Sequence, residues 1–135
     1  MRPCRVLFVC IGNACRSQMA EAFAHHYGAG VLQPASAGLA PAGFVAPDTL
    51  QVMAEKNIDL DGCQSKGLDQ AGVHFDLIVN MSGYRLPSGG PTPMRDWDVP
   101  DPVALSLDRH RQVRDQIEAL VNSLILEFRA SPPRI

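Results

Sequence analysis

The chain has 135 residues, of which 46% are apolar and 19% are charged, a composition that suits one globular domain with one core and excludes a disordered chain. Its formal net charge of −2 gives no general attraction for nucleic acid or for anionic membranes, so any anion site has to be local. No apolar stretch is long enough to span a bilayer, and the apolar run 6–11 is too short for a signal peptide, so we expect a single cytoplasmic domain over residues 1–135.

Apolar runs and helical patterns alternate along the chain. We expect strands at 6–9, 31–37 and 76–81, a further short strand near Trp97, and helices at 17–27, 47–56 and 107–129. Pro34 favours an edge position for the second strand, because proline has no N–H to donate, and the glycines and prolines of 82–93 indicate a loop. This alternation predicts a parallel sheet with helices on both faces, in which ligands bind beyond the carboxyl ends of the strands.

The first strand runs into the segment "CIGNACR", whose residues favour an anion site. Gly12 can adopt a positive φ and Asn13 tolerates one, so the loop can curl and aim successive backbone N–H groups inward. The helix that begins near Ser17 adds the positive end of its dipole, and Arg16 adds a planar fork for two oxygens of a tetrahedral oxyanion. A thiol at Cys10 in this field, beside the Ser17 hydroxyl, should ionise readily and act as a nucleophile.

Other interpretations of this segment remain open. It has neither the GK[ST] of a nucleotide-binding P-loop nor the G-x-G-x-x-G of a dinucleotide site, and the simplest alternative is a buried cysteine that closes a tight turn. The remaining cysteines are expected to be reduced thiols, and no Cys/His spacing indicates zinc. Cys4 and Cys63 are expected to be bystanders, whereas Cys15 is a candidate redox partner that forms a disulfide with Cys10 or only packs behind the loop.

The stretch "CIGNACRS" at 10–17 resembles the Cys-x5-Arg-Ser loop of the low-molecular-weight protein tyrosine phosphatase superfamily, which includes the thiol-coupled arsenate reductases. The "SQMAE" after the loop, the "SAG" at 36–38 and the spacing at 59–68 look closer to the arsenate reductase branch, and "WDVPDP" at 97–102 looks like the family's Asp-Pro motif. The resemblance covers nearly the whole chain. It implies an α/β three-layer sandwich, with a four-stranded parallel sheet and helices on both faces.

The resemblance also implies roles for the matching residues. Cys10 would be the nucleophile, Arg16 the oxyanion clamp and Asp101 the general acid, with Asp96 and Asp98 as nearby rivals for the acid. No metal or other cofactor is implied, because the loop supplies the positive field. The oxyanion would be bound by Ile11, Gly12, Asn13, Ala14, Cys15, Arg16 and Ser17.

The chain departs from both branches of the superfamily at two places. The segment 80–90 has no cysteine to resolve a first thiol adduct, and Val103 and Ala104 follow Asp-Pro where tyrosine phosphatases usually carry aromatic residues. The missing cysteines favour a cysteine-dependent phosphomonoesterase, a protein tyrosine phosphatase that acts on a phosphorylated protein or small phosphomonoester through a cysteinyl-phosphate.

Two alternatives to the phosphatase remain. One is an arsenate reductase that uses the same Cys10 loop with an external thiol, such as glutaredoxin, mycothiol or a similar donor. The other is a non-catalytic oxyanion-binding module, which would keep the loop but show no turnover.

Overall fold

A computed structural model describes residues 2–86 and 91–131, and its helices and strands follow the predicted alternation. The sequence did not predict the three-residue 3-10 helix η1, and residues 87–90 of the predicted loop lie outside the described part. Among the described residues, no helix is both long and apolar enough to cross a membrane. The elements are β1 (Cys4–Cys10), α1 (Arg16–Tyr27), β2 (Leu32–Gly38), α2 (Pro47–Ala54), η1 (Leu68–Gln70), β3 (Leu77–Asn80), β4 (Met94–Asp96) and α3 (Leu107–Ala130).

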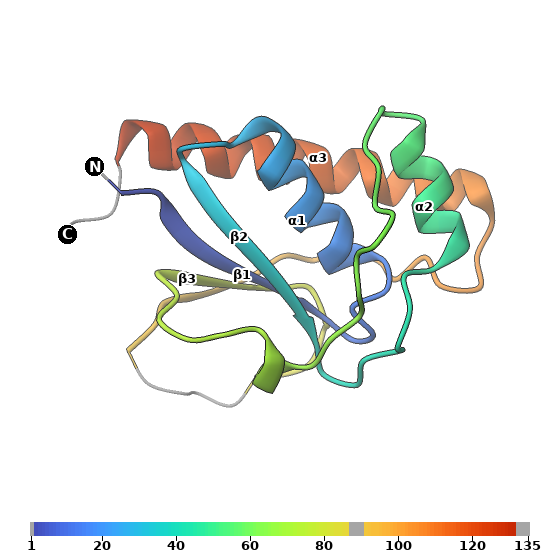
Figure 1. Ribbon diagram of the computed structural model, residues 1–135, viewed down its shortest axis with the longest axis horizontal. Coiled ribbons are helices and arrows are strands. Elements are labelled where there is room, and N and C mark those ends of the chain that lie inside the picture. Colours follow the sequence, from blue (N-terminus) through green and yellow to red (C-terminus); the bar gives the residue numbers. More distant parts are fainter. Residues whose placement is uncertain (1, 87–90, 132–135) are drawn as a thin grey trace.

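The strands form one parallel sheet in the order β2-β1-β3-β4, which confirms the predicted fold class (Figure 1). β1 is central and almost fully buried, as its apolar run requires of a strand covered on both faces. β2 lies at an edge, as Pro34 predicted. Because the strands are parallel, Cys10, Gly38 and Asp96 all lie at carboxyl ends on the same edge of the sheet.

The two faces of the sheet are covered unequally. α1, α2 and α3 lie on one face, where the large core includes Phe8, Phe23 and Ile117, each with no exposed surface (Figure 1). Of the described residues, η1 and the segments around it lie on the other face, over a small cluster that includes Leu7 and Val9. The predicted three layers are therefore present, and the second outer layer is thin.

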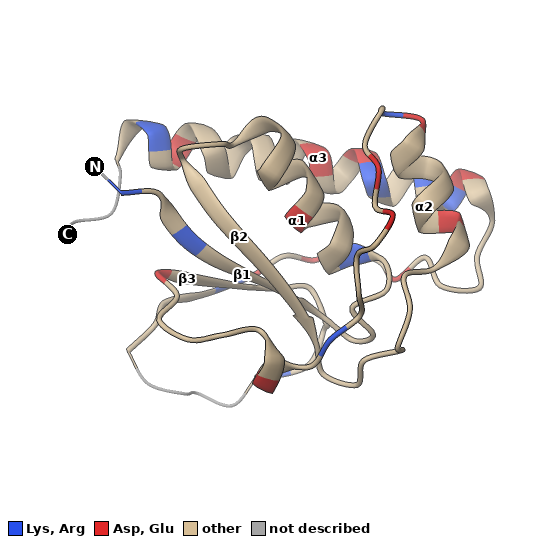
Figure 2. Cartoon of the chain, in the orientation of Figure 1, with Lys and Arg blue, Asp and Glu red and all other residues tan. Residues whose placement is uncertain are grey.

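Ion pairs fix α2 against α3, where charged residues of both signs meet (Figure 2). Glu55, at the end of α2, accepts hydrogen bonds from Arg111 at 2.8 Å and from Arg114 at 2.7 Å. Hydrogen bonds from the two guanidinium groups, Arg111 first, lower the pKa of the Glu55 carboxyl to about 2. The chain that enters α2 donates hydrogen bonds from Ala42 N and Ala46 N to the loop that follows Cys10, so this anchoring also supports that loop.

Candidate active site

The Cys10 thiol lies at the carboxyl end of β1 and is 2% exposed. Its Sγ is 2.9 Å from Ser17 Oγ, and Ser17 Oγ accepts a hydrogen bond from Asn13 Nδ2 at 2.7 Å. The orientation of the Asn13 amide follows from its Oδ1, which accepts from the Lys66 backbone N–H at 2.9 Å and from Gln18 Nε2 at 3.0 Å. Since the Ser17 hydroxyl already accepts from Asn13, its own proton can donate to sulfur, and this contact stabilises a thiolate.

All five carbonyl groups from Cys10 to Ala14 accept hydrogen bonds from outside the loop. Since a trans peptide is planar, each N–H that follows such a carbonyl points the opposite way, toward the other side of the loop. No described group accepts a hydrogen bond from the N–H groups of residues 11–15, so they are available to an anion. The bonds are Leu39 N to Cys10 O (3.1 Å), Ala40 N to Ile11 O (2.8 Å), Ala42 N to Gly12 O (2.9 Å), Gln18 Nε2 to Asn13 O (3.2 Å) and Ala46 N to Ala14 O (3.0 Å).

The turn of the loop depends on Asn13 and not on Gly12. Asn13 has a φ of 48°, in the left-handed region, whereas Gly12 has no positive φ, so the expected flexibility of Gly12 is not what curls the chain. The bonds to its side chain hold Asn13 in this conformation.

Gly38, at the end of β2, is a residue that sequence analysis missed. A Cβ at Gly38 would lie 2.7 Å from Ile11 O and 2.8 Å from Asn13 N, so only glycine allows the loop backbone to pack there. The "SAG" at 36–38 indicated a likeness to the arsenate reductase branch, but nothing in the sequence placed Gly38 against the loop.

Arg16 is 4% exposed, and backbone carbonyls fix one arm of its guanidinium. Nη1 donates to Met81 O and, at 3.0 Å, to Val99 O. Both protons of Nη1 are thereby used, so Nε and Nη2 remain to bind an oxyanion. The Nη2 atom is 3.5 Å from Asp101 Oδ2, which brings the predicted acid to the predicted clamp.

A small pocket is lined by Cys10, Arg16 and Asp101 together with Val103 and residues of the loop. The side chain of Asp101 is 39% exposed, and its Oδ1 accepts from Val103 N at 3.1 Å. Asp96 and Asp98 line a different pocket beyond Arg16, so the structure does not bring the two rival acids to Cys10. The geometry permits attack by sulfur on a bound oxyanion with proton transfer from Asp101.

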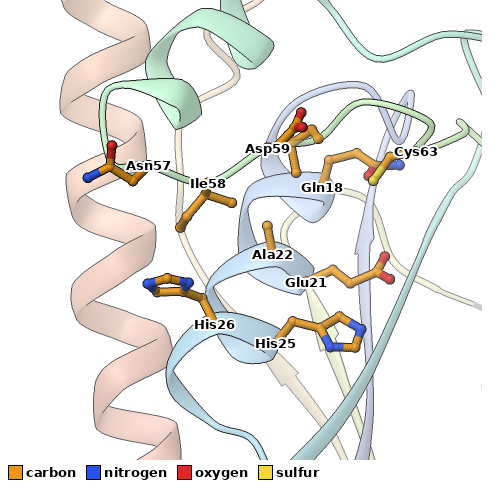
Figure 3. A pocket seen from close by; sticks show the side chains of 10 residues that line it. Gln18, Glu21, Ala22, His25, His26, Asn57, Ile58, Asp59 and Cys63 are labelled. Atoms are coloured by element: carbon orange, nitrogen blue, oxygen red, sulfur yellow. The ribbon is translucent and has the colours of Figure 1, made fainter.

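The other cysteines differ in their relation to this pocket. Cys15 lines it and is 3% exposed, and burial raises the pKa of its thiol to about 11. Cys63 is exposed and lines a separate pocket beside α1, next to Gln18 (Figure 3). Among the described residues, no group of three or more His, Cys, Asp or Glu side chains could hold a metal ion.

Comparison with known proteins gives consistent matches. A family model described as low molecular weight phosphotyrosine protein phosphatase matches residues 5–88. A glutaredoxin arsenate reductase from Synechocystis sp. is 36% identical over 129 residues, which cover 92% of this chain and 98% of the relative. An arsenate reductase from Bacillus cereus is 34% identical over 117 residues, covering 83% and 87% of the two chains.

Solved structures show the same likeness. The structure of an arsenate reductase in the phosphate binding state has a TM-score of 0.85 and 36% identity, and the match covers 94% of this chain and 98% of that one. An arginine phosphatase from Geobacillus stearothermophilus has a TM-score of 0.75 and 25% identity, covering 95% and 94%.

These matches overturn the prediction of a protein tyrosine phosphatase. The relatives that match nearly the whole chain at above 30% identity are named arsenate reductases, so the phosphomonoesterase interpretation is wrong. It relied on the missing cysteines in 80–90. That absence does not exclude thiol chemistry, because the second thiol can come from another molecule.

Proposed function

Because the chain belongs to the low molecular weight phosphotyrosine protein phosphatase family, we propose that it is an arsenate reductase, in which Cys10 attacks arsenate and an external thiol completes the reduction. The observation that carries the proposal is that a glutaredoxin arsenate reductase matches 92% of the chain. This chain also contains the complete Cys-x5-Arg-Ser sequence at 10–17. The chain is an enzyme of this family, and arsenate is the tetrahedral oxyanion that its loop would hold.

In the first step the Cys10 thiolate attacks arsenic. An S–As bond forms, an As–O bond breaks, and Asp101 donates a proton so that the oxygen leaves as water. The N–H groups of 11–15, with Nε and Nη2 of Arg16, stabilise the charge on the remaining oxygens. The Ser17 hydroxyl, 2.9 Å from Cys10 Sγ, supports the thiolate before attack.

In the second step an external thiol attacks Cys10 Sγ. The S–As bond breaks and its electron pair goes to arsenic, which is reduced from As(V) to As(III) and leaves as arsenite. Cys10 is left in a mixed disulfide with the donor. A second thiol then releases Cys10, so two donor thiols are oxidised to one disulfide for each arsenate reduced.

The donor is external in this proposal because none of the other cysteines of the chain suits the second step, and Cys63 lines a different pocket from Cys10. Residues 64–135 contain no cysteine. Cys4 lies six residues from Cys10 along the same strand, about 20 Å away at the rise of a β-strand. The pKa of Cys15 is about 11, so its thiol is protonated at neutral pH and is a poor nucleophile.

The proposal is tested by assaying arsenite formation with glutathione and glutaredoxin, with glutathione alone, and with thioredoxin and its reductase. We expect turnover with the glutathione-containing systems and little with thioredoxin alone. Cys10→Ser should abolish turnover while phosphate binding persists, since the loop and Arg16 remain. Failure of every thiol donor to support arsenite formation by the phosphate-binding wild-type protein would contradict the proposal.

A further inference from the structure

The short segment 64–66 contacts the Cys10 loop from outside, although more than 45 residues separate the two in sequence. Gln64 O accepts from Gln18 Nε2 at 3.0 Å, and the Lys66 backbone N–H donates to Asn13 Oδ1 at 2.9 Å. Between them, Ser65 Oγ donates to Gly12 O at 2.8 Å. Figure 3 shows the Gln18 side chain reaching from α1 to this part of the chain, beside Cys63.

Ser65 differs from its two neighbours because it contributes through its side chain. Its Oγ also accepts from the Gly43 backbone N–H at 3.1 Å, so the hydroxyl bridges the loop and the chain that runs toward α2. Gly12 O accepts a second hydrogen bond, from Ala42 N at 2.9 Å. A carbonyl oxygen has two lone pairs, and at Gly12 both are used by donors from outside the loop.

The two hydrogen bonds that Gly12 O accepts, from Ser65 Oγ and Ala42 N, fix the plane of the Gly12–Asn13 peptide. With Gly12 O held outward, the Asn13 N–H points to the side where an oxyanion binds. Asn13 is also the residue of this loop with a positive φ, a backbone conformation that is intrinsically unfavourable for a residue other than glycine. A peptide free to rotate there would turn the N–H away from the anion.

We propose that Ser65 is a positioning residue for oxyanion binding, which acts by holding the Gly12–Asn13 peptide so that the Asn13 N–H faces the anion. Ser65 touches no reacting atom. It is partly exposed on a connecting segment, so removing its hydroxyl should change oxyanion affinity much more than folding stability. The inference rests on the proposed function only in that an oxyanion occupies the loop.

The test compares Ser65→Ala with Ser65→Thr, which keeps the hydroxyl, and with Ser123→Ala on the exposed side of α3 as a control. The dissociation constant of inorganic phosphate is measured by calorimetry, and stability by urea unfolding. Ser65→Ala should weaken phosphate binding about two- to tenfold, the range for loss of the hydrogen bond to Gly12 O. Its urea midpoint should stay close to that of wild type, because water can replace the hydroxyl as acceptor for the exposed Gly43 N–H. Ser65→Thr should restore affinity to within about twofold. Ser123→Ala should leave phosphate affinity unchanged and raise the urea midpoint slightly, since alanine has the higher helix propensity.

A second readout follows the thiol itself. In a Cys63→Ser background, which removes the exposed thiol of Cys63, phosphate should protect Cys10 from iodoacetamide at a higher half-protecting concentration in Ser65→Ala than in the parent. Unchanged phosphate affinity in Ser65→Ala would overturn the inference, as would a loss that Ser65→Thr does not reverse. Absence of phosphate binding by the parent would overturn it too, whereas phosphate binding without arsenate turnover would count only against the proposed function.

Discussion

Replacement of Gly38 by alanine tests whether the packing of β2 against the Cys10 loop sets the geometry of the site. The new Cβ would lie 2.7 Å from Ile11 O, 2.8 Å from Asn13 N and 2.9 Å from Gly12 C, all of them backbone atoms. Restoring an ordinary contact of 3.4 Å requires a displacement of about 0.7 Å. Overpacking of this kind costs about 1–3 kcal/mol, and misplacement by 1 Å can cost about 10² in rate.

We therefore expect Gly38→Ala to lower kcat/KM for arsenate about 10- to 100-fold and to weaken phosphate binding, because the displaced peptides carry the N–H groups that face the anion. Steady-state kinetics, calorimetry and urea unfolding measure these effects. Gly67→Ala is the matched control, since Gly67 bridges to Gly38 but the close contact of its Cβ would be with the movable Asp69 carboxylate, at 2.9 Å, and its contacts with Pro41, at 3.6 and 3.9 Å, are ordinary ones. If Gly38→Ala keeps kcat/KM within about twofold of wild type, the packing does not set the site geometry.

Three further substitutions or conditions test individual groups. Asp101→Asn should lower kcat/KM for arsenate by about 10²–10⁴, the usual range for acid–base catalysis, and a loss below about threefold would move the acid role elsewhere. Arg16→Lys should cost at least about tenfold in kcat/KM, since an ammonium cannot both bond two carbonyls and present a planar fork; a smaller loss would count against the clamp. A peroxide pulse should oxidise Cys10 to a sulfenic acid, which Cys15 then converts to a Cys10–Cys15 disulfide that dithiothreitol reverses. The disulfide should form about tenfold faster per pH unit between pH 7 and 10, because the Cys15 thiolate attacks and its pKa is about 11. Peptide mapping measures that rate, and a pH-independent rate or the same reversible product in Cys15→Ser would contradict this role for Cys15.

Much of the fold could be predicted from the sequence because its signals are local. The apolar run 6–9 and the helical pattern that follows it gave β1 and α1 to within two residues at each end, and Pro34 placed β2 at an edge. The loop between them could be interpreted for the same reason, since all its residues are consecutive. η1 could not be predicted, because three residues carry no hydrophobic period.

The supports of the loop could not be predicted, because they come from distant segments. Gly38 and Ser65 are ordinary strand-end and loop residues in sequence, and only their contacts with Ile11, Gly12 and Asn13 give them importance. The choice between phosphatase and reductase was also beyond the sequence. It depends on which molecule supplies the second thiol, and an absent cysteine says nothing about a partner.

The sequence predicted the catalytic residues, and the structure shows which of them lie together. The structure places Cys10, Arg16 and Asp101 around one pocket and Asp96 and Asp98 around another. The roles of nucleophile, clamp and acid are predictions, and Cys10→Ser, Arg16→Lys and Asp101→Asn test them in turn.

Cys10 and an external thiol should suffice for arsenate reduction. The double variant Cys15→Ser and Cys63→Ser leaves Cys10 as the thiol at the site, with Cys4 buried near the other end of β1. Its arsenite formation with glutathione and glutaredoxin should stay within about threefold of wild type, and mass spectrometry of the quenched reaction should show glutathione on Cys10. Loss of turnover in a double variant that still binds phosphate, with no adduct on Cys10, would contradict the claim and assign the second step to a thiol of the chain itself.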